Sequence, residues 1–313
     1  MNEDEEGFGA SLNEKEINIP EKKTKSVKLA TGIIILILVL IVIISLLALI
    51  INKSYSKYIG DIFCIYNITN ANENIKLIGS EFKKTSKFDI YIDNIKVEYT
   101  KEYTFDKVGE HKVKFSIIAE INMDYMFKDI KDLISVEFIS NEKKGEILSM
   151  SSTFENCENL KNLVIYGFTM TNIKSMDKIF YNSGLREINF DIFNVSRISD
   201  LSYMFASSPL ESLIINKFIS NNAVNMSYMF YNCTTLTKLI IYKINTNKVT
   251  DMSNMFKDCH SLKNINLSSF NTESVTDMSN IFDGCHSLVS LDLKNFNTNK
   301  VNNMSGMFKL LIF

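Results

Sequence analysis

A repeat of about 26 residues fills the C-terminal part of the chain and limits what it can fold into. The stretch VTDMSNMFKDCHSL at residues 249–262 returns as VTDMSNIFDGCHSL at residues 275–288. Recurrence at such a period is typical of a solenoid, in which each unit needs its neighbours to bury its apolar side. Aligning on the phenylalanine of this element gives one array over 120–313, with intervals of 25–27 residues between Phe127, Phe154, Phe180, Phe205, Phe230, Phe256, Phe282 and Phe308.

Each unit predicts a strand, a turn and a short helix. The spacing of Met252, Met255 and Phe256 is one face of a helix. Six residues after the phenylalanine, or five in two units, an LxxLxL pattern begins that ends in strand alternation. We therefore predict an α/β solenoid of the leucine-rich-repeat type, with one strand and one short helix per unit. Residues that cap helix amides stand five positions before each phenylalanine: Asn122, Ser149, Ser175, Asp200, Asn225, Asp251, Asp277 and Asn303.

The MFxxCxxLxxLxL unit, with FNTxxVTDMS leading into the next one, resembles the BspA-like leucine-rich-repeat surface proteins. The resemblance covers the repeat array and implies a surface-displayed solenoid that serves adhesion or recognition. It implies no particular ligand, because proteins of this kind share a scaffold more than a partner. Function therefore has to be argued from a site.

An uncharged apolar run, IIILILVLIVIISLLALII at residues 33–51, is long enough to cross about 30 Å of hydrocarbon as a helix. We predict a single-pass signal-anchor helix over 29–51. A cleavable signal peptide is the competing interpretation, but the apolar run is overlong and no small-residue cleavage site comes after it. More lysines precede the run than come after it, so the positive-inside rule places a disordered tail, 1–28, in the cytosol and the repeats outside the plasma membrane.

Residues 52–119 predict a small β domain that caps the first repeat. KFDIYIDNIKVEY at 87–99 reads as a hairpin around Asp93 and Asn94, and Val113, Phe115 and Ile117 form one face of a later strand. The last repeat, after Phe308, ends in KLLIF where the pattern calls for a cysteine and a strand. Either these apolar residues fold back over the last unit or the sequence is a fragment.

Composition and motifs narrow the possible functions. The formal net charge is −2 and no basic patch interleaved with aromatic residues is present, so we expect no nucleic-acid partner. GxSxG, HExxH and Gly-rich phosphate loops are missing from the sequence. We therefore expect no enzymatic activity and no cofactor.

The cysteines of the array share one column, in which serine replaces them at Ser183 and Ser208. The plain interpretation is a packed column of small buried side chains. The alternative is a disulfide bond between Cys259 and Cys285, formed in an oxidising compartment. His260 and His286 come directly after these cysteines, but adjacent residues in an extended turn point apart, whereas zinc needs convergent ligands, so we expect no metal. The column consists of Cys157, Cys233, Cys259 and Cys285.

The side chains between the leucines of LxxLxL face away from the core, so stacked strands expose a grid of residues on one face. Within this grid, Ile214, Ile240 and Tyr242 form an apolar cluster, although a face exposed only to solvent does not need apolar side chains. We predict that this face binds a protein or glycan ligand outside the cell; the alternative is a structural coat component that self-associates laterally and has no diffusible ligand. The predicted ligand-binding residues are Val164, Tyr166, Asn189, Ile214, Ile240, Tyr242, Asn266 and Asp292.

Overall fold

The fold is described from a computed structural model, in residues 39–45, 57–140, 145–216, 218, 220–242 and 244–311. The chain divides into two compact units, Met1–Ser56 and Lys57–Phe313. In the first unit, residues 39–45 are helical and exposed. The predicted tail and most of the predicted signal-anchor helix lie outside the described residues. Within the part of the chain that the structure describes, no helix has the length and apolarity to cross a membrane.

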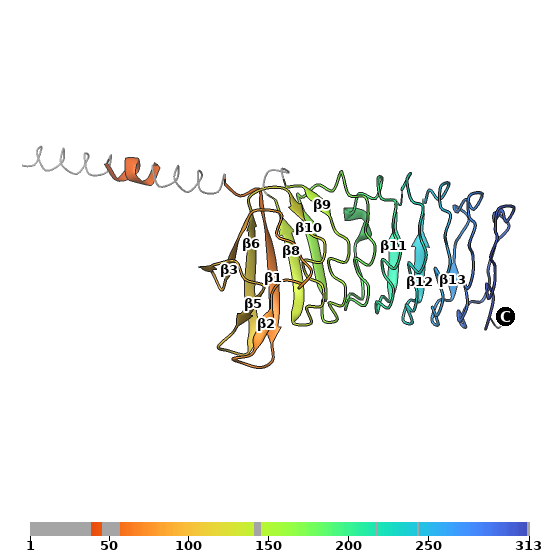
Figure 1. The fold of residues 1–313 in the computed structure, drawn as a ribbon, viewed down its shortest axis with the longest axis horizontal. Helices are drawn as coiled ribbons and strands as arrows, with labels where there is room; N and C mark the ends of the chain where they lie inside the picture. The colour runs from red at the N-terminus through yellow and green to blue at the C-terminus, as the bar shows by residue number, and fades with distance from the viewer. Residues whose placement is uncertain are drawn as a thin grey trace, which may run out of the picture. The chain divides into compact units, whose positions relative to one another are not determined.

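A six-stranded sheet opens the second unit, in the order β10–β8–β1–β6–β3–β4 (Figure 1). At its centre, β1 (Gly60–Ile68) pairs antiparallel with β6 (Gly109–Ile117) and with β8 (Leu133–Ile139), and β8 pairs in parallel with β10 (Asn162–Tyr166). The alternate β1 residues Ile62, Cys64 and Tyr66 are buried, as expected for a strand with one face on the core. The Tyr66 hydroxyl donates a hydrogen bond to the Leu77 carbonyl (2.7 Å).

The predicted hairpin is confirmed. It consists of β3 (Phe88–Ile92) and β4 (Ile95–Val97), joined through Asp93 and Asn94 at φ 46° and 70°. Two consecutive positive φ values match the right-handed twist of the flanking strands, and Asp and Asn tolerate them. Two short ladders complete this region: β2 (Asn74–Lys76) with β5 (Glu102–Thr104), and β7 (Ile121–Asn122) with β9 (Ile147–Ser149).

The first LxxLxL strand of the repeat array is β8. Its buried residues Leu133, Val136 and Phe138 occupy the LxxLxL positions, six residues after Phe127. Strand β1 therefore lies along the first strand of the array, and one continuous sheet joins the two regions.

Later coils stack beside these strands as a β-solenoid (Figure 1). They carry the 3₁₀ helix η1 (Phe190–Ile192) and the strands β11 (Ser212–Ile215), β12 (Lys238–Ile241) and β13 (Asn264–Ile265). The last three strands form a parallel sheet. The predicted repeat solenoid is thus confirmed, with strands in several of its units.

The phenylalanine column forms the spine of the core. From Phe127 to Phe308, neighbouring rings stack with centroids 5.5–6.4 Å apart and planes within 16° of one another. Methionine, leucine and cysteine columns flank the rings and are buried. Each coil therefore buries its apolar side against the next, as the repeat predicts.

The predicted short helix is wrong. The segment around each phenylalanine is a run of tight turns, because the residues two before and two after it have φ between 50° and 75°. Such left-handed residues stop an α-helix, and the column two residues after the phenylalanine is rich in Asp, Asn and Gly, which tolerate this backbone. The columns read Tyr125, Ser152, Lys178, Tyr203, Tyr228, Asn254, Asn280 and Gly306, then Asp129, Asn156, Asn182, Ser207, Asn232, Asp258, Gly284 and Leu310.

Main-chain hydrogen bonds explain why these turns are stable. In one unit the N–H groups of Tyr125 and Phe127 donate to Ser151 and Thr153 of the next coil, whereas the Met126 N–H donates three residues back. The predicted cap residues do accept amides: the Ser253 N–H donates to Asp251 Oδ1 (2.8 Å), for example. Each cap leads into a turn rather than a helix, and the following amides of that turn alternate between the neighbouring coil and the carbonyl three residues back.

Candidate recognition surface

The apolar cluster expected on the strand face is exposed on the second sheet. Leu213 and Leu239 point into the core, while Ile214 and Ile240, opposite each other on β11 and β12, lie on the outer face. Ile214 is 42% exposed and Ile240 is half-buried. Tyr242, just after β12, is 61% exposed. We call Ile214, Ile240 and Tyr242 the β11–β12 patch.

Val164 and Tyr166 lie on β10, in the first sheet, and belong to a different patch. Both are exposed, and in register on β8 they face Glu137 and Ile139. The next strand, β1, adds the exposed Phe63, which pairs with Glu137. Phe63 lies outside the repeat columns, so the periodicity does not predict its place in the patch, although the alternation of GDIFCIYNI puts it on the outer face. Val164, Tyr166 and Phe63 form the β10–β1 patch.

The polar members of the predicted grid close local turns. Side-chain oxygens of Asn189, Asn266 and Asp292 each accept the N–H two residues later, at 3.0–3.1 Å. These turns compete with strand pairing, so η1 replaces a strand after Asn189 and β13 ends just before Asn266. The predicted column is therefore split: its aliphatic residues lie on strands and its polar residues interrupt them.

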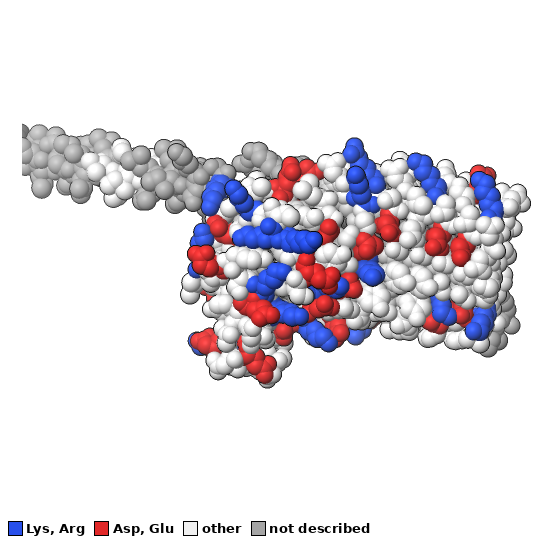
Figure 2. All heavy atoms as spheres, in the orientation of Figure 1, with Lys and Arg blue, Asp and Glu red and all other residues white. Residues whose placement is uncertain are grey.

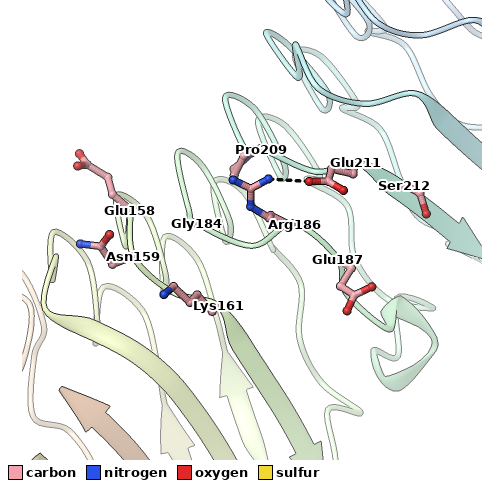
Figure 3. Close-up of a pocket in the computed structure, with 9 residues that line it drawn as sticks. All are labelled: Glu158, Asn159, Lys161, Gly184, Arg186, Glu187, Pro209, Glu211 and Ser212. Carbon is pink, nitrogen blue, oxygen red and sulfur yellow. Dashed lines mark hydrogen bonds and ion pairs between the residues drawn. The ribbon is translucent and has the colours of Figure 1, made fainter. Parts of the chain in front are cut away.

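A notch of about 640 Å³ lies beside the interruption, and sequence reasoning missed it (Figure 3). Two consecutive units are one residue short here: only Gly184 or Pro209 separates the column serine from the next leucine, where other units have two residues. The shortened turn brings its main chain close to that of the preceding coil, and a Cβ on Gly184 would lie 2.3 Å from the Glu158 carbonyl oxygen. The five-residue spacing in these two units was the available signal.

Charged side chains line the notch. The Arg186 guanidinium donates to Glu211 at 2.6 Å, an ion pair drawn as the dashed line in Figure 3, and both side chains are exposed. Glu158 pairs with Lys131 (3.2 Å). Exposed pairs of this kind contribute about 0–1 kcal/mol to stability, so they do not explain why the charges gather here.

The cysteine column is reduced and buried. All five cysteines of the chain are free. In the array each thiol donates to the main-chain carbonyl of a phenylalanine in the preceding coil, as Cys259 does to Phe230 (3.1 Å). The Ser208 hydroxyl donates to Phe180 in the same way (2.5 Å), which explains why serine substitutes for cysteine. Burial raises the pKa of Cys233 and of Cys285 to about 12.

His260 and His286 stack with ring centroids 5.1 Å apart, and each Nδ1 hydrogen-bonds to a carbonyl of the following coil, Gly284 and Leu310 respectively. These contacts tie neighbouring turns together. In the described part of the chain, no three His, Cys, Asp or Glu side chains are grouped closely enough to hold a metal ion.

Comparisons with known proteins identify the repeat array. No curated protein and no solved structure matches the chain. A family profile described as "Mycoplasma protein of unknown function, DUF285" matches residues 121–241 and 224–311, which together cover more than half of the chain. The matched region coincides with the stacked coils of the solenoid. The chain therefore belongs to the DUF285 family of repeat proteins.

Proposed function

We propose that this chain is a surface-displayed recognition protein that binds a protein or glycan ligand through the exposed strand face of its solenoid. The β11–β12 patch carries the proposal. Inward residues of the same strands already fill the core, so Ile214, Ile240 and Tyr242 are not needed there. Apolar and aromatic side chains exposed together on a regular sheet mark contact sites. A tyrosine that becomes buried when a partner binds often contributes a large share of the binding energy.

The sequence before the solenoid supports display at the cell surface. The apolar run at 33–51 would anchor the chain in the plasma membrane with its N-terminus in the cytosol, so that the array stands outside. The resemblance of the repeat unit to BspA-like surface proteins agrees with this placement.

The proposed role involves neither catalysis nor nucleic acid. On the face of the molecule that Figure 2 shows, acidic and basic side chains are interspersed and form no continuous basic track. A nucleic-acid partner would require such a track to neutralise phosphates.

A second candidate function is lateral self-association into a surface coat. The β10–β1 patch favours it, because a molecule with two exposed apolar patches has two places where copies could meet. Concentration-dependent association of the purified chain, measured by analytical ultracentrifugation in detergent, would support this alternative. Disruption of the association by Phe63→Asp would assign it to the β10–β1 patch.

The test of the proposed function begins with topology. The full chain with a C-terminal tag is expressed in cells, and the tag is expected to be accessible to antibody and to protease without permeabilisation. Binding of those cells to a panel of host cells and matrix proteins is then compared with that of Ile240→Asp and Tyr242→Ala variants. Both variants should lose binding at least tenfold.

Val224→Asp is the matched control for Ile240→Asp, because Val224 is an exposed aliphatic residue outside the strands. It adds the same charge away from the patch and should leave binding unchanged. A protected tag would overturn the surface location, and unchanged binding of both patch variants would overturn the role of the β11–β12 patch.

A further inference from the structure

The notch between the two sheets has a lining unlike that of the rest of the strand face. Among its side chains are three glutamates, Glu158, Glu187 and Glu211, together with Lys161 and Arg186. The formal balance of these five is one negative charge. Asn159 and Ser212 add an amide and a hydroxyl, so the set offers acceptors and donors in close mixture.

This chemistry narrows the class of ligand. The lining has no excess of positive charge, because Arg186 pairs with Glu211 and Lys131 pairs with Glu158. The third carboxylate, Glu187, would repel a phosphate, a sulfate or another anion. Among the lining residues Pro209 alone has an apolar side chain, so an apolar ligand would bring charged and polar groups out of water without giving them partners. A ligand rich in lysine or arginine would meet Lys161 and Arg186, and Arg186 already occupies Glu211.

Sugar hydroxyls fit the lining better. Hydroxyls on neighbouring carbons both donate and accept, and a carboxylate or a guanidinium can engage two of them at once. The volume of about 640 Å³ lies within the roughly 300–1,000 Å³ typical of small-molecule sites. We propose that the notch lined by Arg186, Glu187 and Ser212 binds a neutral oligosaccharide, an inference that rests on the proposed recognition function and names its ligand class.

The notch also adjoins the β11–β12 patch. Ser212, on the notch wall, is the first residue of β11, and Ile214 lies two residues later on the same outer face. A sugar ring has apolar C–H faces as well as hydroxyls. An oligosaccharide held in the notch would therefore extend onto Ile214 and Ile240, which explains why a polar notch and an apolar patch lie side by side.

The test measures binding of the detergent-solubilised full chain to an array of immobilised neutral oligosaccharides of hexoses and N-acetylhexosamines, with sialylated and sulfated ones alongside. Neutral glycans should be bound, and Glu187→Gln and Ser212→Trp should each reduce that binding at least tenfold. The tryptophan fills the notch from an exposed strand position, and Glu187→Gln changes charge at nearly constant size. Asn264→Trp is the matched control, because Asn264 stands in the same column two strands away, on β13.

The outcomes separate this inference from the proposed function. Binding of no neutral glycan, or preference for the anionic glycans, would overturn it. Glycan binding that is lost in Ile240→Asp but unchanged in Ser212→Trp would also overturn it, while leaving the β11–β12 patch as the contact site. If cells still adhere through the β11–β12 patch but the chain binds none of the immobilised oligosaccharides, the proposed function stands and the glycan inference fails.

Discussion

Tyr203 and Tyr228 stack face to face on neighbouring coils, with ring centroids 4.4 Å apart and planes 5° apart. Both residues have left-handed backbone, with φ of 55° and 58°. Later coils carry Asn254, Asn280 and Gly306 at this position, which suit that backbone better. Each tyrosine therefore carries a backbone cost of about 1–2 kcal/mol, against a stacking gain of about 0.5–1.5 kcal/mol for the pair.

This balance predicts a small effect on stability for one substitution of Tyr203 and a large loss for another. Tyr203→Asn loses the stack but relieves the backbone, so the free energy of unfolding should change by less than about 1 kcal/mol. Tyr203→Val loses the stack and places a β-branched residue in the left-handed region, which should cost about 2 kcal/mol or more. Urea unfolding of residues 57–313, monitored by circular dichroism, measures both. Equal losses in the two variants would contradict a left-handed Tyr203 in solution.

The phenylalanine spine predicts a gradient of stability along the array. Phe256 is fully buried between Phe230 and Phe282, so Phe256→Ala should lower the free energy of unfolding by about 3–5 kcal/mol. Phe308 stacks on Phe282, its one ring neighbour among the described residues, and is 48% exposed, so Phe308→Ala should cost far less. The same urea experiment compares them, and similar losses at both positions would contradict this order of stacking.

The buried thiols predict chemical inertness. A raised pKa leaves cysteine in its unreactive thiol form at neutral pH, and burial excludes the reagent. Native protein should therefore consume almost no thiol reagent at pH 7.5, and all five cysteines should react once urea unfolds the chain. Cys259→Ser should retain stability to within about 1 kcal/mol, because serine at Ser208 makes the same hydrogen bond to a phenylalanine carbonyl. Rapid labelling in the folded state would contradict this packing.

Sequence periodicity predicted the solenoid, its spine and several of its strands, because those features depend on residue types that repeat in register. Leu213, Ile215, Leu239 and Ile241 are buried at the predicted spacing. The helix prediction failed because an i, i+3, i+4 apolar pattern also fits a run of turns. The aspartates and asparagines two positions after the phenylalanine, such as Asn232 and Asp258, were the signal for left-handed turns.

The candidate site was harder to predict than the fold. Register on β11 and β12 comes from the repeat, so the exposure of Ile214 could be inferred from the sequence. The notch arises from a missing residue in two units and from close approach of the main chain at Gly184, which only three-dimensional packing reveals. The β10–β1 patch joins Phe63 to Val164, about 100 residues apart, through pairing across β8.

Acid conditions should weaken the first sheet through Asp89. Its Oδ2 accepts a hydrogen bond from the Tyr58 hydroxyl (2.5 Å) and pairs with Lys96 (3.1 Å) and Lys57 (3.3 Å). The hydrogen bond from Tyr58, helped by the two lysines, lowers the pKa of Asp89 to about 2 in the folded chain. In the unfolded chain the carboxyl titrates near its ordinary value of about 3.9.

Because the folded pKa is the lower one, Asp89 contributes stability above about pH 4 and loses that contribution as the pH falls to about 2. The urea midpoint of Asp89→Asn should therefore lie below that of the natural chain at pH 5, and the gap should shrink toward pH 2. Asp106→Asn, which removes an exposed carboxylate from the same region, is the control and should show a much smaller gap at pH 5. A gap for Asp89→Asn that stays constant from pH 5 to pH 2 would show that the carboxylate is not held by Tyr58 and the lysines.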